Sequence, residues 1–375
     1  MTPLIGTFSA GTARGFGWLF KAAGGGSGGA LWTWGDAAQG QLGSGNTTNR
    51  SSPVQVGALT TWSKISVGQL HNLAIKTDGA LWAWGYNLSG ALGLNDLTNR
   101  SSPVQVGALT TWSVVSGGGA SLAIKTDGTL WAWGANSQGE LGLNDLTRRS
   151  SPVQVGALTT WSFVNAGEAN GYAIKTDGTL WAWGFGGDSS VGDGTTTTRS
   201  SPVQIGADTN WSTVDCGLNV PLALKTDGTL YAWGNGFGGA IGNGSTVSRS
   251  SPVQIGASTW SVVGSGNNYS LAIKTDGTLW AWGYNPQGSL GTNNTTNYSS
   301  PVQVGALTTW SKVSTGALHN LATKTDGTLW AWGWNAQGQL GLNDLTNRSS
   351  PVQVGALTNW NAVSGGNYHS VAIKT

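Results

Sequence analysis

Short runs of apolar residues, separated by glycine, proline, serine and asparagine, follow one another along most of the chain. In one stretch they are 62–67 (WSKISV), 72–77 (NLAIKT), 81–84 (LWAW) and 103–106 (PVQV). Runs of this length between turn residues are typical of β-strands. Asp78-Gly79 joins the second run to the third and suits a type I′ hairpin turn, whose two central residues need positive φ. Because no stretch keeps a helical period, the pattern predicts an all-β protein.

A motif that ends in Trp-Gly repeats at a nearly constant interval. Its last tryptophan is Trp34, Trp84, Trp133, Trp183, Trp233, Trp282 and Trp332, at spacings of 50, 49, 50, 50, 49 and 50 residues. Intervals of this size are typical of propeller blades. The repeats begin with a third and a fourth run and end with a first and a second, so neither end completes a blade alone. We therefore expect a seven-bladed β-propeller of four-stranded blades, closed by N- and C-terminal strands that share one blade.

Tryptophan is the most unusual feature of the composition. Alternation places Trp82 and Trp84 on one face of their strand and Leu81 and Ala83 on the other, so both faces of the sheet are apolar. Of the 22 tryptophans, 20 recur in three positions of the repeat. This regularity predicts packing between blades rather than sugar stacking or light capture.

Residues 1–29 lie outside the repeat. They contain the apolar side chains Phe8, Phe16, Trp18, Leu19 and Phe20, followed by a glycine-rich run that ends at Gly29. We interpret 1–29 as an anchor or docking arm with a glycine-rich hinge, which attaches the propeller of 30–375 to a larger assembly. A disordered tail is the alternative.

Charge and cysteine content exclude several classes of protein. A formal net charge of +2 argues against a nucleic-acid binder that relies on phosphate neutralisation. The recurring lysines and arginines are expected to be solubilising groups at strand ends. A single cysteine, Cys216, excludes an intramolecular disulfide and a cysteine metal cluster. No apolar run is long enough to span a membrane, and the first residues lack the pattern of a signal peptide.

One copy of the repeat resembles the regulator of chromosome condensation (RCC1) repeat. The resemblance is carried by 68–74 (GQLHNLA), Asp78-Gly79, 81–87 (LWAWGYN), 90–93 (GALG) and Pro103-Val104, and it extends over about Ala30 to Thr375. It implies a seven-bladed propeller that interacts with proteins, chromatin or other ligands. The founding member exchanges nucleotide on a small GTPase and docks on nucleosomes, using inserted loops and a basic tail. This chain has no long insertion in a blade, and it lacks the Trp-Arg pair of the plant photoreceptor relatives.

The copies differ from one another mainly in two of their four loops. The loops between strands two and three, and between one blade and the next, repeat Thr-Asp-Gly and Gly-Ala-Leu-Thr-Thr almost unchanged. The 1–2 and 3–4 loops vary and are expected on the opposite face, where aromatic rings beside amides suit a sugar or protein surface. Drift in tolerant loops is the alternative. The predicted ligand-binding residues are Tyr86, Asn87, Phe185, Phe237, Asn268, Tyr269, Tyr284, Asn285, His319, Trp334, Asn335, Tyr368 and His369.

Catalytic and metal-binding chemistry has little support in the sequence. His71, His319 and His369 share one position of the repeat, where a structural hydrogen bond is expected. His319 and His369 belong to adjacent blades, but no carboxylate lies near either in sequence, so no metal is expected. The pairs Asn95-Asp96, Asn144-Asp145 and Asn343-Asp344 are candidate Ca²⁺ loops, yet each offers one carboxylate, too few for tight binding. We expect no cofactor and no enzymatic activity.

These features favour a non-catalytic binding scaffold. The leading hypothesis is an adhesion or decoration protein of a virion or extracellular surface, which recognises a glycan or protein through its variable loops. It rests on the unprocessed start, the close similarity of the copies and the arm of 1–29. The alternative is an intracellular, cytoplasmic protein-interaction propeller, for example a regulator of a small GTPase.

Overall fold

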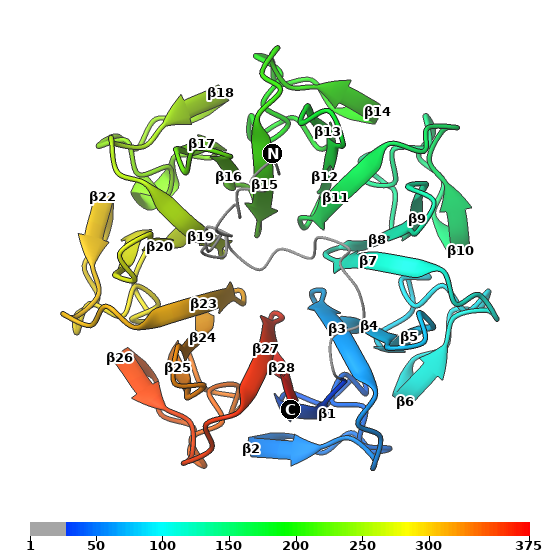
Figure 1. Ribbon diagram of the computed structural model, residues 1–375, viewed down its shortest axis with the longest axis horizontal. Helices are drawn as coiled ribbons and strands as arrows, with labels where there is room; N and C mark the ends of the chain where they lie inside the picture. The colour runs from blue at the N-terminus through cyan, green and yellow to red at the C-terminus, as the bar shows by residue number, and fades with distance from the viewer. Residues whose placement is uncertain (1–27) are drawn as a thin grey trace, which may run out of the picture.

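The computed structural model describes residues 28–375 and contains seven four-stranded antiparallel sheets arranged as blades around a central axis (Figure 1). The first strand of each blade lies nearest the axis and the fourth lies at the rim. The prediction of an all-β, seven-bladed propeller is confirmed. We number the blades 1 to 7 from the first complete set of four strands.

The strands of blades 1 to 3 have the following bounds. Blade 1 contains β3 (Trp62–Val67), β4 (His71–Lys76), β5 (Leu81–Gly85) and β6 (Arg100–Gln105). Blade 2 contains β7 (Trp112–Gly117), β8 (Ala120–Lys125), β9 (Leu130–Gly134) and β10 (Arg149–Gln154). Blade 3 contains β11 (Trp161–Ala166), β12 (Asn170–Lys175), β13 (Leu180–Gly184) and β14 (Arg199–Gln204).

Blades 4 to 7 repeat this plan. Blade 4 contains β15 (Trp211–Cys216), β16 (Pro221–Lys225), β17 (Leu230–Gly234), the 3₁₀ turn η1 (Phe237–Gly239) and β18 (Arg249–Gln254). Blade 5 contains β19 (Trp260–Ser265), β20 (Tyr269–Lys274), β21 (Leu279–Gly283) and β22 (Tyr298–Gln303). Blade 6 contains β23 (Trp310–Thr315), β24 (His319–Lys324), β25 (Leu329–Gly333) and β26 (Arg348–Gln353). Blade 7 contains β27 (Trp360–Gly365), β28 (His369–Lys374), β1 (Ala30–Gly35) and β2 (Arg50–Gln55).

Blade 7 closes the ring by pairing the two ends of the described chain. β1 pairs with β28 in an unbroken antiparallel register from Ala30 opposite Lys374 to Gly35 opposite His369. The predicted shared blade is therefore confirmed. The chain joins the propeller one residue before the expected boundary at 30, because Gly29 exchanges main-chain hydrogen bonds with Trp62 of blade 1 at 2.9 and 3.2 Å.

Two local expectations from the sequence need correction. The Asp-Gly hairpin exists, but only Gly79 has a positive φ, of 82°, and Asp78 does not, so the turn is not type I′. Instead the Gly79 amide donates to the Lys76 carbonyl at 2.9 Å, as in a type I turn followed by a left-handed glycine. The fourth strand of blade 1 also begins at Arg100 rather than at 103, because the register with β5 resumes across a bulge.

The last tryptophan of each motif joins its blade to the preceding one. All seven of these side chains are completely buried. Each indole N–H donates to a main-chain carbonyl in the 3–4 loop of the preceding blade at 2.7–3.0 Å, as Trp84 does to Gln41 and Trp332 to Ser289. A buried indole needs such an acceptor. The sequence-based prediction of blade packing thus holds for Trp34, Trp84, Trp133, Trp183, Trp233, Trp282 and Trp332.

The recurring lysines have a more specific position than the sequence suggested. In blade 1 the Lys76 ammonium lies 3.6 Å from the ring centroid of Trp82 and 5.0 Å from that of Trp62. The same arrangement occurs at Lys125, Lys175, Lys274 and Lys324, while Lys225 lies over Tyr231 at 4.5 Å. A cation over an aromatic face is attracted by the ring quadrupole. These lysines therefore cover the tryptophans at the edge of each blade, in addition to solubilising it.

The innermost strands are joined by a second ring of hydrogen bonds. In six blades the side chain at the fifth position of the first strand accepts from a main-chain amide of the next blade, at 2.8–3.1 Å. The acceptors are Ser66, Ser116, Asn165, Asp215, Ser314 and Ser364. In blade 5 this position is Gly264, and here the Thr315 hydroxyl donates to the Ser265 carbonyl at 2.7 Å instead. Each blade is thereby tied to its neighbour near the axis.

One substitution should add a bond that most copies already have. In blade 2 the Thr129 hydroxyl accepts from the Trp131 indole at 2.8 Å and donates to Asp127 at 2.6 Å. Blade 1 has Ala80 at this position, and the buried Trp82 indole nitrogen has no partner in the described structure. We expect Ala80→Thr to raise the free energy of unfolding by about 1 kcal/mol, measured by guanidinium denaturation.

Ala30→Thr is the matched control for this substitution. Ala30 holds the same position in blade 7, beside the unpartnered Trp32 indole, but no aspartate precedes it in a hairpin turn. The new hydroxyl would lack its carboxylate acceptor, so a smaller gain is expected. Equal gains at both positions would show that the hydroxyl does not need the carboxylate acceptor. No gain at Ala80 would show that the tryptophan bond does not stabilise the blade.

Candidate ligand-binding face

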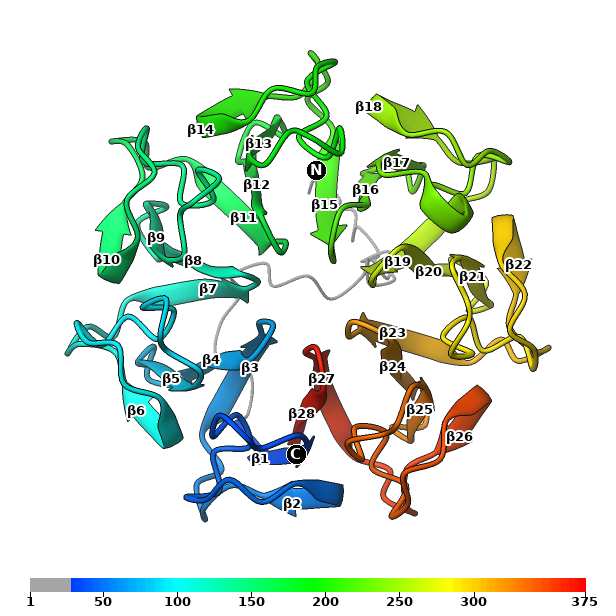
Figure 2. The ribbon, with the colours of Figure 1, turned by 180° about the vertical axis from the view of Figure 1, so that it is seen from behind.

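The variable 1–2 and 3–4 loops lie on one face of the disc, as the sequence predicts for an up-and-down blade. In blade 1 the first residue of the 3–4 loop, Tyr86, donates its amide to the Leu70 carbonyl of the 1–2 loop at 2.9 Å. The equivalent bond occurs in five other blades, at Asp36, Phe185, Asn235, Tyr284 and Trp334. Figure 2 shows this face, which we call the loop face. The Thr-Asp-Gly turns lie on the opposite side of the disc, which we call the turn face.

The 1–2 loops form a closed ring around the axis. Each donates one main-chain amide to a carbonyl of the next blade's loop, beginning with Gln69 to Gly118 and returning with Asn367 to Gln69, at 3.0–3.4 Å. Every one of these loops begins with a glycine. At Gly118 an added Cβ would lie 2.1 Å from the Gly167 carbonyl oxygen, closer than any real contact. The centre of the loop face is therefore held by main-chain bonds, and its glycine position does not tolerate a side chain.

Three of the predicted asparagines hold the 3–4 loops from within. Asn87, Asn285 and Asn335 are completely buried. Asn87 accepts from the Leu92 amide at 2.9 Å and donates to the carbonyls of Asp96 and Thr98 at 3.1 and 3.2 Å. The other two repeat this pattern. Asn136 has the same role in blade 2, although the sequence analysis did not single it out. These amides shape the loops and do not reach the surface.

The predicted histidines are also buried, and each bonds to the neighbouring blade. His319 Nε2 lies 2.9 Å from Ser370 Oγ, and His369 Nε2 lies 2.9 Å from Asn72 Oδ1. His71 makes the equivalent contact to Ser121 at 2.8 Å. Burial lowers the pKa of His71 to about 4 and those of His319 and His369 to about 3, so all three are neutral at pH 7. The expected structural hydrogen bond is present at each.

Tyr269 takes the histidine position in blade 5. It is completely buried, and its hydroxyl lies 2.9 Å from Asn320 Oδ1 of blade 6 and 3.0 Å from the His319 carbonyl. Burial raises the pKa of this phenol. Tyr269 therefore joins two blades in the same way as the histidines, and its ring does not face a ligand.

The remaining aromatic residues of the prediction reach the loop face, and four of them form pairs. The rings of Phe237 and Tyr284, from blades 4 and 5, have centroids 5.1 Å apart. Those of Trp334 and Tyr368, from blades 6 and 7, are 5.3 Å apart. Phe237 is 54% exposed and Tyr368 is 38% exposed, whereas Tyr284 and Trp334 are partly buried. Four consecutive blades thus present aromatic side chains in contact across two blade boundaries.

Three other predicted residues are partly buried on the same face. They are Tyr86, Phe185 and Asn268. Asn268 has a φ of 59° and its amide contacts the Asn267 side chain at 2.9 Å. The residues predicted from the sequence did not include the exposed aliphatic side chains of the 3–4 loops, which are Leu88, Leu97, Leu146, Val247 and Leu345. In the sequence these residues stand out as single aliphatic side chains among polar loop residues, and this pattern could have identified them.

The candidate Ca²⁺ loops bind arginine instead. Asp96 contacts Arg100 at 2.5 Å through one oxygen and accepts from the Thr98 amide at 2.9 Å through the other. Asp145 and Asp344 repeat the arrangement with Arg149 and Arg348. Over residues 28–375 no group of three or more His, Cys, Asp or Glu side chains is placed to hold a metal. Cys216 is buried, which raises the pKa of its thiol to about 12.

A large cavity follows the axis and is lined by the first strands and the 1–2 loops. Its volume is about 1510 Å³. Lys64 and Lys312 line it in blades 1 and 6, and each ammonium donates to a main-chain carbonyl of the next blade. Glu168 and Asp215 line it in blades 3 and 4, on the other side of the ring. Burial raises the pKa of both carboxyl groups and lowers that of both lysines.

The proposed docking residues Phe8, Phe16, Trp18, Leu19 and Phe20 lie outside the described residues. Within residues 28–375 no helix is long and apolar enough to cross a membrane.

Comparison of the sequence with family models decides its classification. The regulator of chromosome condensation (RCC1) repeat matches seven consecutive segments, 28–75, 78–124, 127–172, 177–224, 227–273, 276–323 and 326–373. The chain belongs to the RCC1 repeat family. A second model of the same repeat matches four shorter segments, 62–91, 113–140, 261–289 and 310–339. A search of curated protein sequences gives no match to this RCC1-repeat chain.

Solved structures of RCC1-like propellers have the same fold. Prp20p from Saccharomyces cerevisiae, described with its binding to Gsp1p and histones, superposes with a TM-score of 0.82 at 19% identity over 95% of this chain and 93% of its own. Human WBSCR16 gives 0.82 at 20% identity over 92% and 99%. Yeast RCC1 (Prp20) bound to Kap60 gives 0.82 at 18% over 100% and 96%. At sequence identities of 18–20% this structural similarity establishes the fold alone.

Proposed function

We propose that this RCC1-repeat protein is a non-catalytic scaffold that binds a protein partner through its loop face. The two aromatic pairs, Phe237 with Tyr284 and Trp334 with Tyr368, are the observation that carries the proposal. Tyrosine and tryptophan contribute large contact areas at low entropic cost and are enriched where proteins bind one another. The amides of Asn235, Tyr284 and Trp334 bond the 3–4 loops of these blades to the ring of 1–2 loops, and this prior ordering reduces the entropic cost of binding.

The rest of the loop face supports the same proposal. The buried asparagines and histidines are occupied by hydrogen bonds within the propeller, so they are not available to a ligand. We therefore restrict the proposed contact residues to Tyr86, Phe185, Phe237, Asn268, Tyr284, Trp334 and Tyr368, together with the exposed aliphatic residues of the 3–4 loops, Leu88, Leu97, Leu146, Val247 and Leu345. Aromatic residues surrounded by aliphatic and amide side chains are typical of a protein interface with a hydrophobic centre.

The structural neighbours favour a protein partner over a virion or a glycan. Prp20p is described as binding Gsp1p and histones, and its complex with Kap60 has been solved. The intracellular protein-interaction propeller is therefore the function that we propose, in place of the virion or adhesion role. The identity of the partner is not carried over, because the likeness to Prp20p reflects the shared fold.

Replacing the exposed members of the aromatic pairs should abolish partner binding. We expect the double variant Phe237→Ser, Tyr368→Ser to lose the proteins that wild-type protein retains in affinity capture from cells, by at least about tenfold, because truncating a hot-spot residue typically costs 2 kcal/mol or more. The measurement is quantitative mass spectrometry of the captured proteins.

The turn face supplies the matched control. Leu59→Ser, Leu109→Ser removes two side chains of similar exposure, 48% and 49%, from the opposite side of the disc. This variant should retain the same partners as the wild type. If it loses them while the loop-face variant keeps them, the proposed surface is wrong. Binding of both variants and wild type to a glycan array, without a captured protein, would favour the adhesion hypothesis.

A further inference from the structure

The boundary between blades 4 and 5 differs from the other six. Six connections from a fourth strand to the next first strand are six residues long, whereas the connection from β18 to β19 has five, Ile255 to Thr259. Five of the longer connections carry an exposed leucine, at Leu59, Leu109, Leu158, Leu307 and Leu357. The short connection has Ser258 and no leucine. Because six boundaries form the same fold with the longer loop, the shortening is not required for folding.

The shorter connection opens space beside the neighbouring hairpin turn. At five other turns a Cβ added to the glycine would lie 1.9–2.2 Å from a carbonyl of the adjoining connection, for example at Gly79 against Thr110. At Gly228, beside the short connection, the nearest atom is the Trp260 carbonyl oxygen at 3.2 Å. The turn and the connection are therefore less closely packed at this boundary.

The arginine of blade 4 also lacks the acidic partner that four other copies have. Arg199 of blade 3 pairs with Asp193 at 2.6 Å, and Arg100, Arg149 and Arg348 have equivalent partners. In blade 4 Asn243 takes the place of the aspartate. Arg249 is exposed, and it makes no ion pair with any residue from 28 to 375. Arg50 of blade 7 is partly buried and also makes no ion pair with a described residue, but its connection has the full length.

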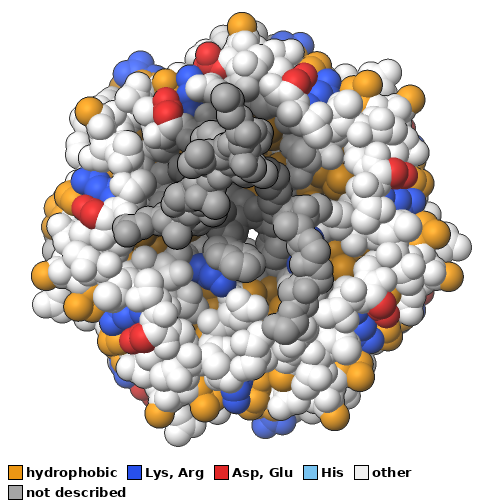
Figure 3. All heavy atoms as spheres, in the orientation of Figure 1, with side chains coloured by type: hydrophobic (Ala, Val, Ile, Leu, Met, Phe, Trp, Pro, Cys, Tyr) orange, Lys and Arg blue, Asp and Glu red, His pale blue; other side chains and the backbone are white. Residues whose placement is uncertain are grey.

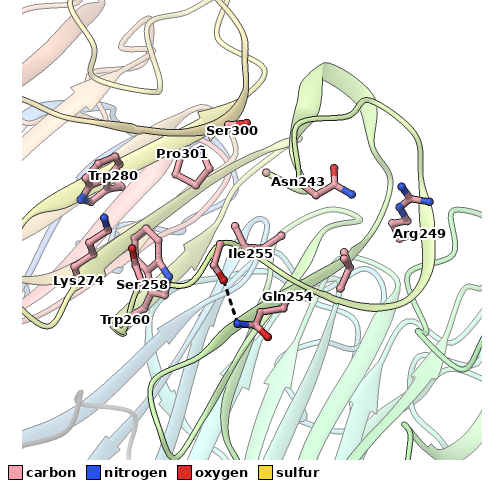
Figure 4. A pocket seen from close by; sticks show the side chains of 13 residues that line it. Asn243, Arg249, Gln254, Ile255, Ser258, Trp260, Lys274, Trp280, Ser300 and Pro301 are labelled. Atoms are coloured by element: carbon pink, nitrogen blue, oxygen red, sulfur yellow. Dashed lines mark hydrogen bonds between the residues drawn. The ribbon is translucent and has the colours of Figure 1, made fainter.

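These two departures meet in one groove at the rim, shown in Figure 4, with a volume of about 620 Å³. Arg249 and Gln254 of β18 line one side, and Lys274, Trp280 and Pro301 line the other; Val253 of β18 also lines the groove. The volume is within the range of ligand sites in proteins. Among the residues that line the groove there is no aspartate or glutamate. Its charged groups are both cations.

The positions of the Arg249 and Lys274 side chains indicate which kind of ligand the groove can bind. Figure 4 shows Lys274 beside Trp280 on one side of the groove and Arg249 on the opposite side. Arg249 to Gln254 is a strand of six residues, and its five intervals of about 3.3 Å give it a length of at most about 17 Å. Val253 and Pro301 are partly exposed apolar side chains of the groove, whereas the side chain of Ile255 is buried in the core. Asp276 interacts with Lys274, but one carboxylate oxygen accepts from the Thr278 amide at 2.9 Å and hydroxyl at 2.6 Å.

We propose that this rim groove is a second binding site, which takes a short acidic peptide segment in an extended conformation. One carboxylate contacts the Arg249 guanidinium, whose planar donors match it, and a second lies near the Lys274 ammonium. Apolar side chains of the peptide pack on Val253 and Pro301. The rim groove shares no proposed contact residue with the loop face. Loss of binding at one site would therefore leave the proposal for the other site unaffected.

A labelled hexapeptide tests the proposal. The probe is fluorescein-Asp-Glu-Val-Val-Glu-Asp, with the neutral counterpart Asn-Gln-Val-Val-Gln-Asn, and binding is followed by fluorescence anisotropy at low salt. Wild-type protein should bind the acidic peptide at least about tenfold more tightly than the neutral one. Arg249→Glu should weaken binding of the acidic peptide by about tenfold or more. Inserting a leucine between Ala257 and Ser258, which restores the longer connection, should weaken it as well.

Arg50→Glu is the matched control, because Arg50 also lacks an acidic partner but borders a connection of full length. The affinity of the Arg50→Glu variant for the acidic peptide should stay within about twofold of that of the wild type. The unfolding midpoint of each variant establishes that it is folded. Equal losses at Arg50 and Arg249, an unchanged affinity after the leucine insertion, or no saturable binding would overturn the proposal. Displacement of the peptide by a single-stranded oligonucleotide of tighter affinity would also overturn its assignment to peptides.

Discussion

Removing β28 should prevent the propeller from folding. A chain that ends at Gly365 lacks His369–Lys374, which pairs with β27 on one side and β1 on the other. It also loses the completely buried side chains of Val371 and Ala372 and opens the ring between blades 6 and 1. The net stability of a folded protein is only about 5–15 kcal/mol, so the loss of two strand ladders and a core strand exceeds it. Circular dichroism and tryptophan fluorescence should show no cooperative unfolding transition.

A circular permutant separates the loss of β28 from a mere change of chain ends. Joining Thr375 to Gly29 through one aspartate creates Lys-Thr-Asp-Gly-Ala-Leu-Trp, which is identical to residues 76–82 of blade 1. New ends between Gly206 and Ala207 fall in an exposed connection. This permutant keeps all seven blades complete and should unfold cooperatively, like the wild type. A cooperative transition at the wild-type temperature in the chain that ends at Gly365 would show that blade 7 does not close the ring.

Acid should destabilise the protein well above the pKa of ordinary carboxyl groups. His71, His319 and His369 have folded-state pKa values of about 4, 3 and 3, against about 6.5 in the unfolded chain. As pH falls below 6.5, the unfolded state therefore binds protons that the folded state does not. Stability present above pH 6.5 is lost progressively down to about pH 4, by roughly 1–3 kcal/mol for each histidine. Urea denaturation at half-unit steps of pH measures this slope.

Asparagine is the appropriate replacement, because Asn170 occupies the same position of the repeat in blade 3. The triple variant His71→Asn, His319→Asn, His369→Asn should be less stable at pH 7.5, since it loses three contacts between blades. Its stability should nevertheless change little between pH 6.5 and pH 5. An undiminished slope in this variant would assign the acid sensitivity to other groups. The aspartates of the hairpin turns, whose pKa values are lowered by bonds to threonine, lose their contribution only at lower pH.

The loop face shows where prediction from sequence fails. Aromatic and amide residues in variable loops were all predicted to bind a ligand. The structure instead divides them between the interior and the surface. Asn87 and Phe237 both follow the third strand of their blades, yet Asn87 is completely buried and Phe237 is 54% exposed. The two side chains hold different positions of the loop: Asn87 is the second residue after its strand, where blade 4 has the buried Gly236, and Phe237 is the third, where blade 1 has the exposed Leu88. The residue types alone carry no such information.

The sequence by itself determined the architecture of this protein. Seven copies of one motif at a fixed spacing specify seven blades, because each copy supplies apolar residues for both faces of a sheet that only a neighbouring blade can cover. The split between the two chain ends specified the shared blade. The tertiary structure decided which side chains are available for function, since burial and hydrogen bonding depend on contacts between residues about 50 positions apart. It alone showed that the histidines tie adjacent blades together and that Arg249 borders an open groove, because both depend on packing between blades.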